Sequence, residues 1–340
     1  IYPERSDAQD PDAIDLAFYL APQPDYNYED LQGGFNLGCR LSLASSDMNV
    51  DTLKKLTACG SALSWLAVGL TEAQLGHSLD ALEAFLNADE AFPRSELIQF
   101  FLGREYLFLV DREAVLKFAQ DELEKQAEAA FSRAIEINPA YPRAYIGLGS
   151  VFAKRARRIV NDFETGVRPI EALNQAGLFT NQAIASYAKA LAASEESPTP
   201  AIPLDSVARL GAGNMHILAG IITFHQGILN GSLEQFDQAI ATLEDTLEPF
   251  LTSEQIRYLT QSYEYLGTAY RWKAHVLQTD LKINESLETY QRALHYFDQC
   301  VDLGGNTQDR IVREEIIATI CIPNRAEVQQ NLENLGGTQG

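Results

Sequence analysis

Basic residues are scarce in this sequence. Lysine and arginine total 26 against 47 aspartates and glutamates, so the 340 residues carry a formal net charge of -21 at pH 7. A surface this acidic repels phosphate backbones and anionic lipid headgroups. We therefore expect no nucleic-acid partner.

Long apolar runs are missing as well. The longest one, at 216–224, falls far short of the roughly 18 residues that cross a bilayer, so we expect no transmembrane segment. The first residue is Ile1 instead of Met, which is typical of a chain whose leader has been removed, or of a fragment. We expect export to the periplasm or the extracellular space, with a cytoplasmic location as the alternative.

Motifs for catalysis and cofactor binding are also lacking. The sequence has no phosphate-binding loop, HExxH, nucleophile elbow or CxxC. The run at 211–216 begins like a dinucleotide loop, but His216 replaces the third glycine and the run lies in a helical stretch. The five histidines are scattered, which disfavours a metal site. We expect no enzyme, cofactor or metal. The catalytic alternative, a sugar- or peptide-processing helical domain, would need a carboxylate constellation that the sequence does not show.

What the sequence does contain is an internal repeat. In residues 62–95, small residues on two predicted helices would let the helices approach closely, and aromatic residues would fill the space around them. A proline then stops the chain before the next helix. This pattern resembles the tetratricopeptide repeat (TPR), a helix–turn–helix unit of about 34 residues. The residues that carry it are Trp65, Gly69, Ala81, Phe85, Ala88 and Pro93.

The pattern recurs along the chain, and the resemblance covers roughly residues 28–302. A weaker unit is centred on Gly227, and residues 28–59 are a degenerate first unit in this interpretation. The clearer repeats carry Gly103, Ala127, Phe131, Ala134 and Pro139; then Tyr145, Gly149, Ala183, Tyr187 and Ala190; and finally Gly267, Tyr290 and Ala293.

The resemblance implies an all-α fold, a right-handed TPR-like solenoid of about five to six helix pairs. It would occupy residues 28–302, between an extended N-terminal arm at 1–27 and a cap helix with a flexible tail at 303–340. Extra residues separate the two halves of several units and keep helical spacing, so we expect long, overhanging helices. The proline-rich run at 197–203 could divide two sub-arrays.

Two segments near the chain ends alternate like strands. One interpretation pairs them between chains, head to tail, which builds open fibres. The other, which we favour, is a C-terminal cap helix and an N-terminal arm that lies in the solenoid groove. The residues expected to make the assembly contacts are Ile14, Leu16, Phe18 and Leu20 with Ile316, Ile320 and Ile322.

The four cysteines form two pairs that are local in sequence. If residues 28–45 and 50–59 form a helical hairpin, Cys39 and Cys59 lie level with each other, which allows a disulfide. Cys300 and Cys321 would not be level on a plain returning helix, so a bond there requires the chain to double back or to reach another subunit. Two glycosylation sequons, at Asn230 and Asn284, are expected by chance in a chain this long.

One basic cluster interrupts the acidic sequence. It is either a solvated helix end that complements the helix dipole or a dock for an acidic partner, including another copy of this chain. Its members are Lys154, Arg155, Arg157 and Arg158.

The resemblance implies a non-enzymatic scaffold for protein–protein interaction. In one form it is an exported structural subunit that self-assembles end to end through the N-terminal arm and the C-terminal segment. In the alternative form it is a monomeric adaptor that binds a peptide or protein in the solenoid groove.

Overall fold

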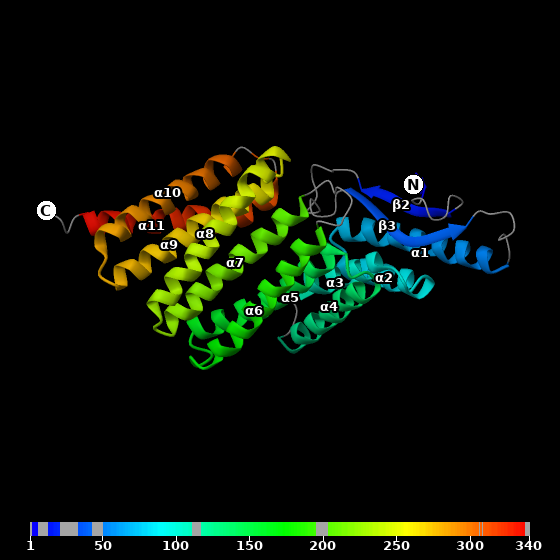
Figure 1. Ribbon diagram of the computed structural model, residues 1–340, viewed down its shortest axis with the longest axis horizontal. Helices are drawn as coiled ribbons and strands as arrows, with labels where there is room; N and C mark the ends of the chain where they lie inside the picture. The colour runs from blue at the N-terminus through cyan, green and yellow to red at the C-terminus, as the bar shows by residue number, and fades with distance from the viewer. Residues whose placement is uncertain are drawn as a thin grey trace. The chain divides into compact units, whose positions relative to one another are not determined.

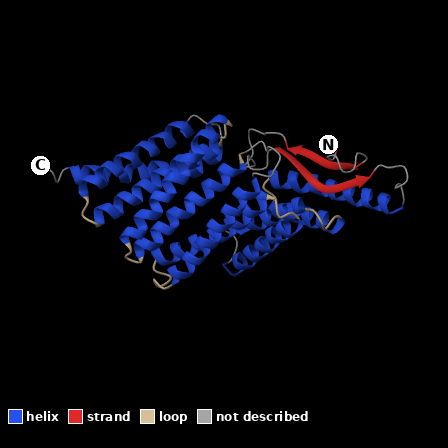
Figure 2. Cartoon of the chain, in the orientation of Figure 1, coloured by secondary structure: helices blue, strands red, loops and turns tan. Residues whose placement is uncertain are grey.

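The computed structural model describes residues 2–5, 13–20, 33–42, 50–110, 117–194, 203–305, 307 and 309–336. Most of these residues are helical, and three strands lie near the N-terminus (Figure 1, Figure 2). The chain divides into two compact units. Unit 1 comprises Ile1–Val151 and Ala192–Ile202, and unit 2 comprises Phe152–Leu191 and Pro203–Gly340. Most of the proline-rich run at 197–203 lies outside the described residues.

The elements follow one another in a simple order. Unit 1 contains β1 (Tyr2–Arg5), β2 (Ala13–Leu20), β3 (Gly33–Ser42), α1 (Val50–Gln74), α2 (Ser78–Ala91), α3 (Glu96–Val110) and α4 (Lys117–Ile137). The unit boundaries fall within α5 (Pro142–Glu164) and α6 (Ala172–Ser194). Unit 2 continues with α7 (Leu204–His225), α8 (Leu229–Thr252), α9 (Ile256–Thr279), α10 (Ile283–Gly305), the π-helix η2 (Val312–Cys321) and α11 (Ile322–Gly336).

Successive helices pair through short connections, as α1 does with α2 and α9 with α10. This arrangement confirms the predicted all-α, TPR-like helical repeat. Helices of 22 to 25 residues, such as α1, α7, α8 and α9, confirm that the helices are long.

The N-terminal region differs from the prediction. Residues 33–42 form a strand, so the helical hairpin expected within 28–59 is wrong. β2 pairs antiparallel with β1 along one edge and with β3 along the other. In β3, buried Phe35, Leu37 and Cys39 alternate with exposed Asn36 and Gly38. This period-two burial requires a strand, because a helix would spread these residues over all its faces.

The sheet also changes the expected assembly contacts. Ile14, Leu16, Phe18 and Leu20 lie in β2, which is the middle strand. Its backbone pairs within the chain, from Ile14 to Ala17 with β1 and from Ala13 to Leu20 with β3. The N-terminal segment is therefore part of a sheet and does not lie as a single arm in a groove.

Glycine beneath an aromatic ring is the recurring packing contact of the helix pairs. A Cβ on Gly69 of α1 would lie 2.5 Å from the ring of Phe85 on α2. A Cβ on Gly103 of α3 would lie 2.8 Å from Phe131 on α4. Both phenylalanines are almost fully buried. Only glycine allows the backbone to touch the ring this closely, so these positions set the spacing of each pair.

In unit 2 the repeat register differs from the expected one. Gly227 does not lie against a neighbouring helix, because it forms the turn between α7 and α8 with φ 80°. The glycine that approaches an aromatic ring is Gly220, whose Cβ would lie 2.6 Å from Phe236. In the next pair, Gly267 of α9 faces Phe297 of α10. This contact lies several turns from the connection between the two helices, so both helices extend well beyond the turn.

The α9–α10 pair repeats the register of the α7–α8 pair, with Ser286 and Ala274 in the places of Ser232 and Gly220. Ser232 donates a hydrogen bond from its hydroxyl to the Gly220 carbonyl at 2.7 Å, and Ser286 does the same to Ala274 at 2.9 Å. Both serines are fully buried. These serines complete the sequons at Asn230 and Asn284, so helix packing accounts for the serine of each sequon.

The C-terminal stretch is helical, so the strand interpretation is wrong. That this helical segment caps the solenoid stays a prediction. Val312, Ile316, Ile317 and Cys321 are buried, a spacing that places one face of η2 against the helices beside it. Tertiary packing thus overrides the strand preference of β-branched residues. Pro323 follows directly in the first turn of α11. Its ring conflicts with the carbonyl four residues earlier, which accounts for the widened helix before it.

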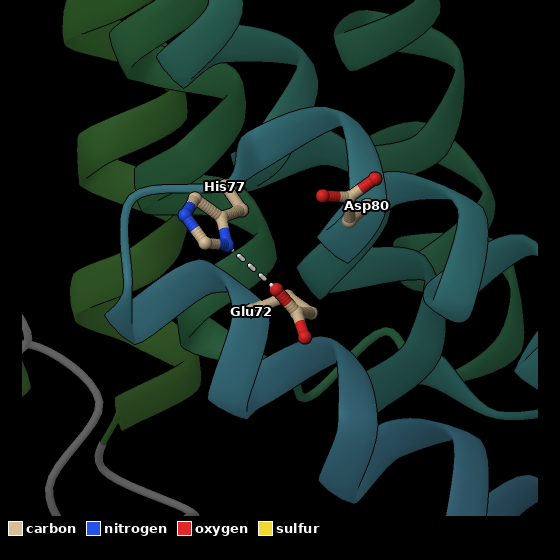
Figure 3. A group of neighbouring side chains, drawn as sticks. All are labelled: Glu72, His77 and Asp80. Carbon is tan, nitrogen blue, oxygen red and sulfur yellow. Dashed lines mark hydrogen bonds and ion pairs between the residues drawn. The ribbon is translucent and has the colours of Figure 1, made fainter.

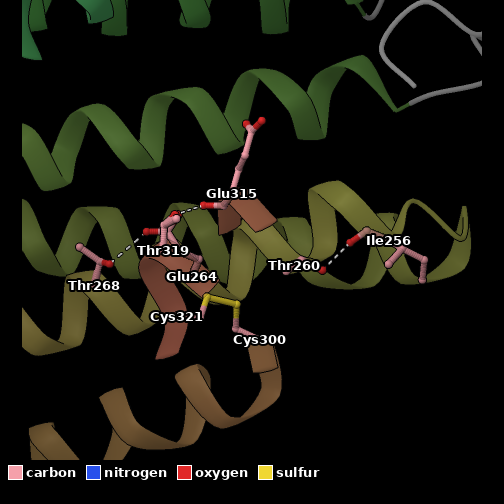
Figure 4. The surroundings of a disulfide bond; sticks show 8 residues. All are labelled: Ile256, Thr260, Glu264, Thr268, Cys300, Glu315, Thr319 and Cys321. Carbon is pink, nitrogen blue, oxygen red and sulfur yellow. Dashed lines mark hydrogen bonds between the residues drawn. A yellow bond between two sulfur atoms is a disulfide. The ribbon is translucent and has the colours of Figure 1, made fainter. Parts of the chain in front are cut away.

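Two disulfides fasten the ends of the fold. Cys39 of β3 bonds Cys59 of α1, so the pairing is the expected one, although a strand has replaced one of the two helices. Cys300 of α10 bonds Cys321 at the end of η2 (Figure 4). The sequence predicts that Cys300 and Cys321 lie at different heights along the two helices if the second segment is a regular α-helix. A π-helix has more residues per turn and advances less per residue, and the chain doubles back within the same molecule.

Helix α7 is long and apolar enough to cross a membrane by length and composition, a test that core helices also pass. Half of its most apolar stretch is buried inside the protein, and α7 packs against α8 and α9. The expected absence of a transmembrane segment stays a prediction.

Candidate functional site

Three turns of unit 2 lie along the same edge of that unit (Figure 1). They connect α5 to α6, α7 to α8, and α9 to α10. Each turn exposes a large aliphatic side chain to solvent. The exposed fractions are 64% for Val167 in the first turn, 53% for Ile228 in the second and 84% for Leu281 in the third. We call these three turns the turn edge.

A row of aromatic side chains runs beside the turn edge, at the C-terminal ends of α5, α7 and α9. The ring of Phe163 lies 5.1 Å from His225, measured between centroids. Phe224 lies 6.0 Å from Trp272 and 5.2 Å from His275. These five rings form a continuous cluster from three helices. His275 is exposed, and the other four residues are half-buried. We call this cluster the aromatic row.

Charged side chains lie beside the aromatic row and contact its members. His225 pairs with Glu164 at 3.2 Å between Nε2 and Oε1. The Arg271 guanidinium lies 5.5 Å from the Trp272 ring centroid and donates two hydrogen bonds to Glu327 of α11.

Although His275 is exposed, its contacts with Phe224 and Trp272 partly desolvate the ring. This desolvation and the nearby Arg271 charge lower the pKa of His275, while Glu327 acts in the opposite direction. A neutral imidazole keeps this part of the row apolar at neutral pH.

One buried carboxyl lies deeper in unit 2. Burial raises the pKa of Glu264 in α9 to about 7, while Arg157 and a hydrogen bond from the Thr268 hydroxyl act in the opposite direction. Figure 4 shows Glu264 and Thr268 on α9, near Thr319 of η2 and the Cys300–Cys321 bond. Sequence reasoning did not identify this residue, because an isolated glutamate in an acidic chain carries no signal of burial.

The basic cluster predicted as a dock lies on α5. The Arg155 guanidinium stacks over Phe152 at 5.8 Å and over Phe179 at 5.7 Å. Arg157 hydrogen-bonds Tyr265 and is electrostatically coupled to Glu264. Two of the four side chains therefore interact within unit 2. A dock formed by Lys154, Arg155, Arg157 and Arg158 stays a prediction.

The repeat-signature residues are mostly in the core and not at a binding surface. Trp65, Pro93 and Pro139 are exceptions, because all three are exposed. Trp65 is 39% exposed, so it does not fill the space between α1 and α2 as fully as expected. From α5, a Cβ on Gly147 would contact Phe131, whereas the sequence pattern had singled out buried Gly149. The fully buried alanines of the signature are Ala81, Ala88, Ala127, Ala134, Ala183, Ala190 and Ala293.

A second cluster, formed by α8, α9 and α10, lines an open surface pocket of about 470 Å³. Tyr270 and Tyr296 stack with ring centroids 5.5 Å apart. Both hydroxyls donate to the Glu244 carboxylate, at 3.4 Å and 3.3 Å. The chain itself thus satisfies the polar groups at the centre of this pocket, which indicates a structural role.

The fold of this chain is similar to that of several solved structures. No protein-family model matches the sequence, and no curated protein matches it either. Among solved structures, MamA is 14% identical with a TM-score of 0.38, covering 71% of this chain and 94% of its own. PilF of Pseudomonas aeruginosa is 11% identical with a TM-score of 0.38, over 81% and 99%. YrrB, described as a TPR protein with an unusual peptide-binding site, is 14% identical with a TM-score of 0.36, over 77% and 93%. Likeness at this level says nothing about partners or activity.

Proposed function

We propose that this protein is a non-enzymatic scaffold that binds a protein segment along the turn edge and the aromatic row of unit 2. The partner segment would present apolar side chains to the aromatic row and the exposed aliphatics. Aromatic side chains supply much of the binding energy at protein interfaces. Exposed apolar surface of this kind is typical of an interaction site.

The main observation in support of this proposal is the conformation and exposure of Leu281. It has φ 59°, a left-handed conformation that glycine adopts without strain and leucine does not. Its side chain is 84% exposed, so it gains little from burial in the isolated chain. A residue that costs stability and contributes almost no packing is retained more readily when it contacts a partner.

The proposal can be tested by selection from a random peptide library displayed on phage, using the whole purified protein as the target. We expect enriched peptides rich in apolar and aromatic residues. The same selection against a Trp272→Ala, Leu281→Gly double variant should lose these sequences. Trp65→Ala is the matched control, because it removes an indole from unit 1 and should leave the enrichment unchanged. If the double variant and the native protein enrich the same peptides, the turn edge is not the binding surface.

A second candidate function is self-assembly of an exported protein. Among the described strands, none pairs with the outer edge of β3, and unpaired edges of this length accept strands from other chains. Two disulfides favour an oxidising compartment. A strand-to-strand contact with residues 316–322 is not available to this assembly, because that segment is helical.

Light scattering over a range of protein concentrations tests the assembly hypothesis. If copies join through β3, mass should rise with concentration, and Asn36→Lys should suppress the rise, because Asn36 is exposed and a charge disfavours pairing at a sheet edge. A monomeric mass at every concentration would leave the adaptor as the function.

A further inference from the structure

The connection between α1 and α2 gathers three side chains that are ligands of divalent metals. Glu72 lies in the last turn of α1, His77 in the connection and Asp80 in the first turn of α2 (Figure 3). One ligand atom from each lies within 4.8 Å of the other two. His77 Nδ1 already donates a hydrogen bond to Glu72 Oε2 at 2.8 Å.

The backbone holds these side chains together. Gly76 takes φ 77° after the end of α1. The Gly76 N–H then donates to the Ala73 carbonyl, and the His77 N–H donates to the Glu72 carbonyl, both at 2.9 Å. This is the paired hydrogen-bond pattern of a Schellman helix end. It places the His77 backbone directly against the turn that bears Glu72.

Helix α2 places the third ligand. Its first hydrogen bond runs from the Ala81 N–H to the His77 carbonyl. His77 and Asp80 are therefore three residues apart on one helical turn and face the same side.

Four other turns of this protein share the same backbone geometry and serve as an internal comparison. Their left-handed residues are Gly166, Gly227, Glu254 and Leu281, and each shows the same pair of hydrogen bonds. At the three ligand positions these turns carry Asp162, Val167 and Ile170; Thr223, Ile228 and Gly231; Phe250, Gln255 and Tyr258; and Leu277, Lys282 and Glu285. Of these five turns, the α1–α2 turn alone combines a histidine with two carboxylates.

We propose that Glu72, His77 and Asp80 form a binding site for Zn²⁺. The imidazole carries its single proton on Nε2, so that His77 Nδ1 offers its lone pair to the metal in place of the hydrogen bond to Glu72. Each carboxylate supplies one oxygen, and water completes the shell. A tetrahedral site with bonds of about 2.0–2.1 Å puts ligand atoms roughly 3.4 Å apart, so exposed side chains need only small rotations to reach it. One imidazole nitrogen selects Zn²⁺ over Mg²⁺ and Ca²⁺, which take oxygen ligands. The two carboxylates neutralise the ion.

Calorimetric titration of the full-length, tag-free protein with ZnCl₂ tests the site. We expect one equivalent to bind at neutral pH, with His77→Gln and Asp80→Asn each weakening affinity at least tenfold. Glu83→Gln on α2 is the charge-matched control, and His295→Gln on α10 is the imidazole-matched control. Both should bind like the native protein. Excess MgCl₂ should not compete.

Thermal unfolding supplies a second readout that does not depend on calorimetric heats. A ligand that binds the folded state raises the melting temperature, so Zn²⁺ should raise it for the native protein and not for His77→Gln. If Zn²⁺ binds without saturation at one equivalent, or if His77→Gln binds as tightly as the native chain, the site does not exist.

Discussion

Leu281 occupies the position in the α9–α10 turn that Gly227 occupies in the α7–α8 turn. Both residues have positive φ, 59° for the leucine and 80° for the glycine. In each turn the following N–H donates to the carbonyl five residues earlier, from Lys282 to Leu277 and from Ile228 to Thr223, at 2.9 Å. The backbone is therefore the same, and leucine bears a strain there that glycine avoids.

Leu281→Gly should stabilise the protein. Relief of the left-handed strain exceeds the added flexibility of glycine in the unfolded chain, so we expect a gain of about 0.5–1 kcal/mol in the free energy of unfolding. Denaturant unfolding measures it. Leu281→Ala is the matched control, because it removes the same side chain but keeps a Cβ in the strained conformation. An equal gain in both variants would show that solvent exposure, and not φ, sets the cost.

Gly69→Ala should destabilise unit 1 by about 1–3 kcal/mol, because the new methyl group would lie 2.5 Å from the Phe85 ring. Gly60→Ala in the same helix is the matched control. Nothing lies within 4 Å of a Cβ there, so alanine should stabilise α1 by up to about 1 kcal/mol through helix propensity. Thermal melts of both variants compare these effects directly, and changes of the same sign would contradict the packing described for Gly69.

The repeat pattern could be predicted because its residues act locally. A small residue facing an aromatic ring across a short connection leaves a periodic signal, and Gly69 with Phe85 shows it. The register of unit 2 was harder to predict, because the sequence does not distinguish Gly227, which forms the turn, from Gly220, which packs against Phe236. β3 was missed although Phe35, Leu37 and Cys39 alternate as on a strand, because the repeat interpretation placed this stretch in a degenerate helical unit.

The turn edge also escaped sequence reasoning, for a physical reason. Val167, Ile228 and Leu281 look like ordinary core residues until the turns are placed in space. Phe163, Phe224 and Trp272 are far apart in sequence, and packing of α5, α7 and α9 brings them together. The Cys300–Cys321 bond depends on the winding of η2, which Pro323 influences from the following turn.

Glu264 should make stability depend on pH. Its folded pKa of about 7 lies above the ordinary value of 4.5. The protonated form therefore stabilises the fold fully below about pH 4.5, and this contribution is lost as the pH rises through about 7. Glu264→Gln should flatten the fall in unfolding free energy between about pH 5 and 8. Glu288→Gln, which changes a side chain that lines the α8–α10 pocket, is the control and should leave the slope intact. An unchanged slope in Glu264→Gln would contradict a neutral buried carboxyl.

Removing the Cys300–Cys321 bond should lower the stability of unit 2 by about 3 kcal/mol, since the bond closes a loop across 21 residues of separation. The double variant Cys300→Ala, Cys321→Ala in a Trp65→Phe background leaves Trp272 as the only tryptophan. Its fluorescence then follows the unfolding of unit 2. An unchanged midpoint would mean that packing of η2 alone holds the C-terminal segment.

The affinity of Leu281→Gly for a peptide decides whether the turn edge of unit 2 binds a protein segment. A peptide selected on the native protein should be titrated by calorimetry into the native chain and into this variant. We predict at least tenfold weaker binding to the variant, even though the variant unfolds at a higher denaturant concentration. Equal affinity in the two proteins would contradict binding at the turn edge.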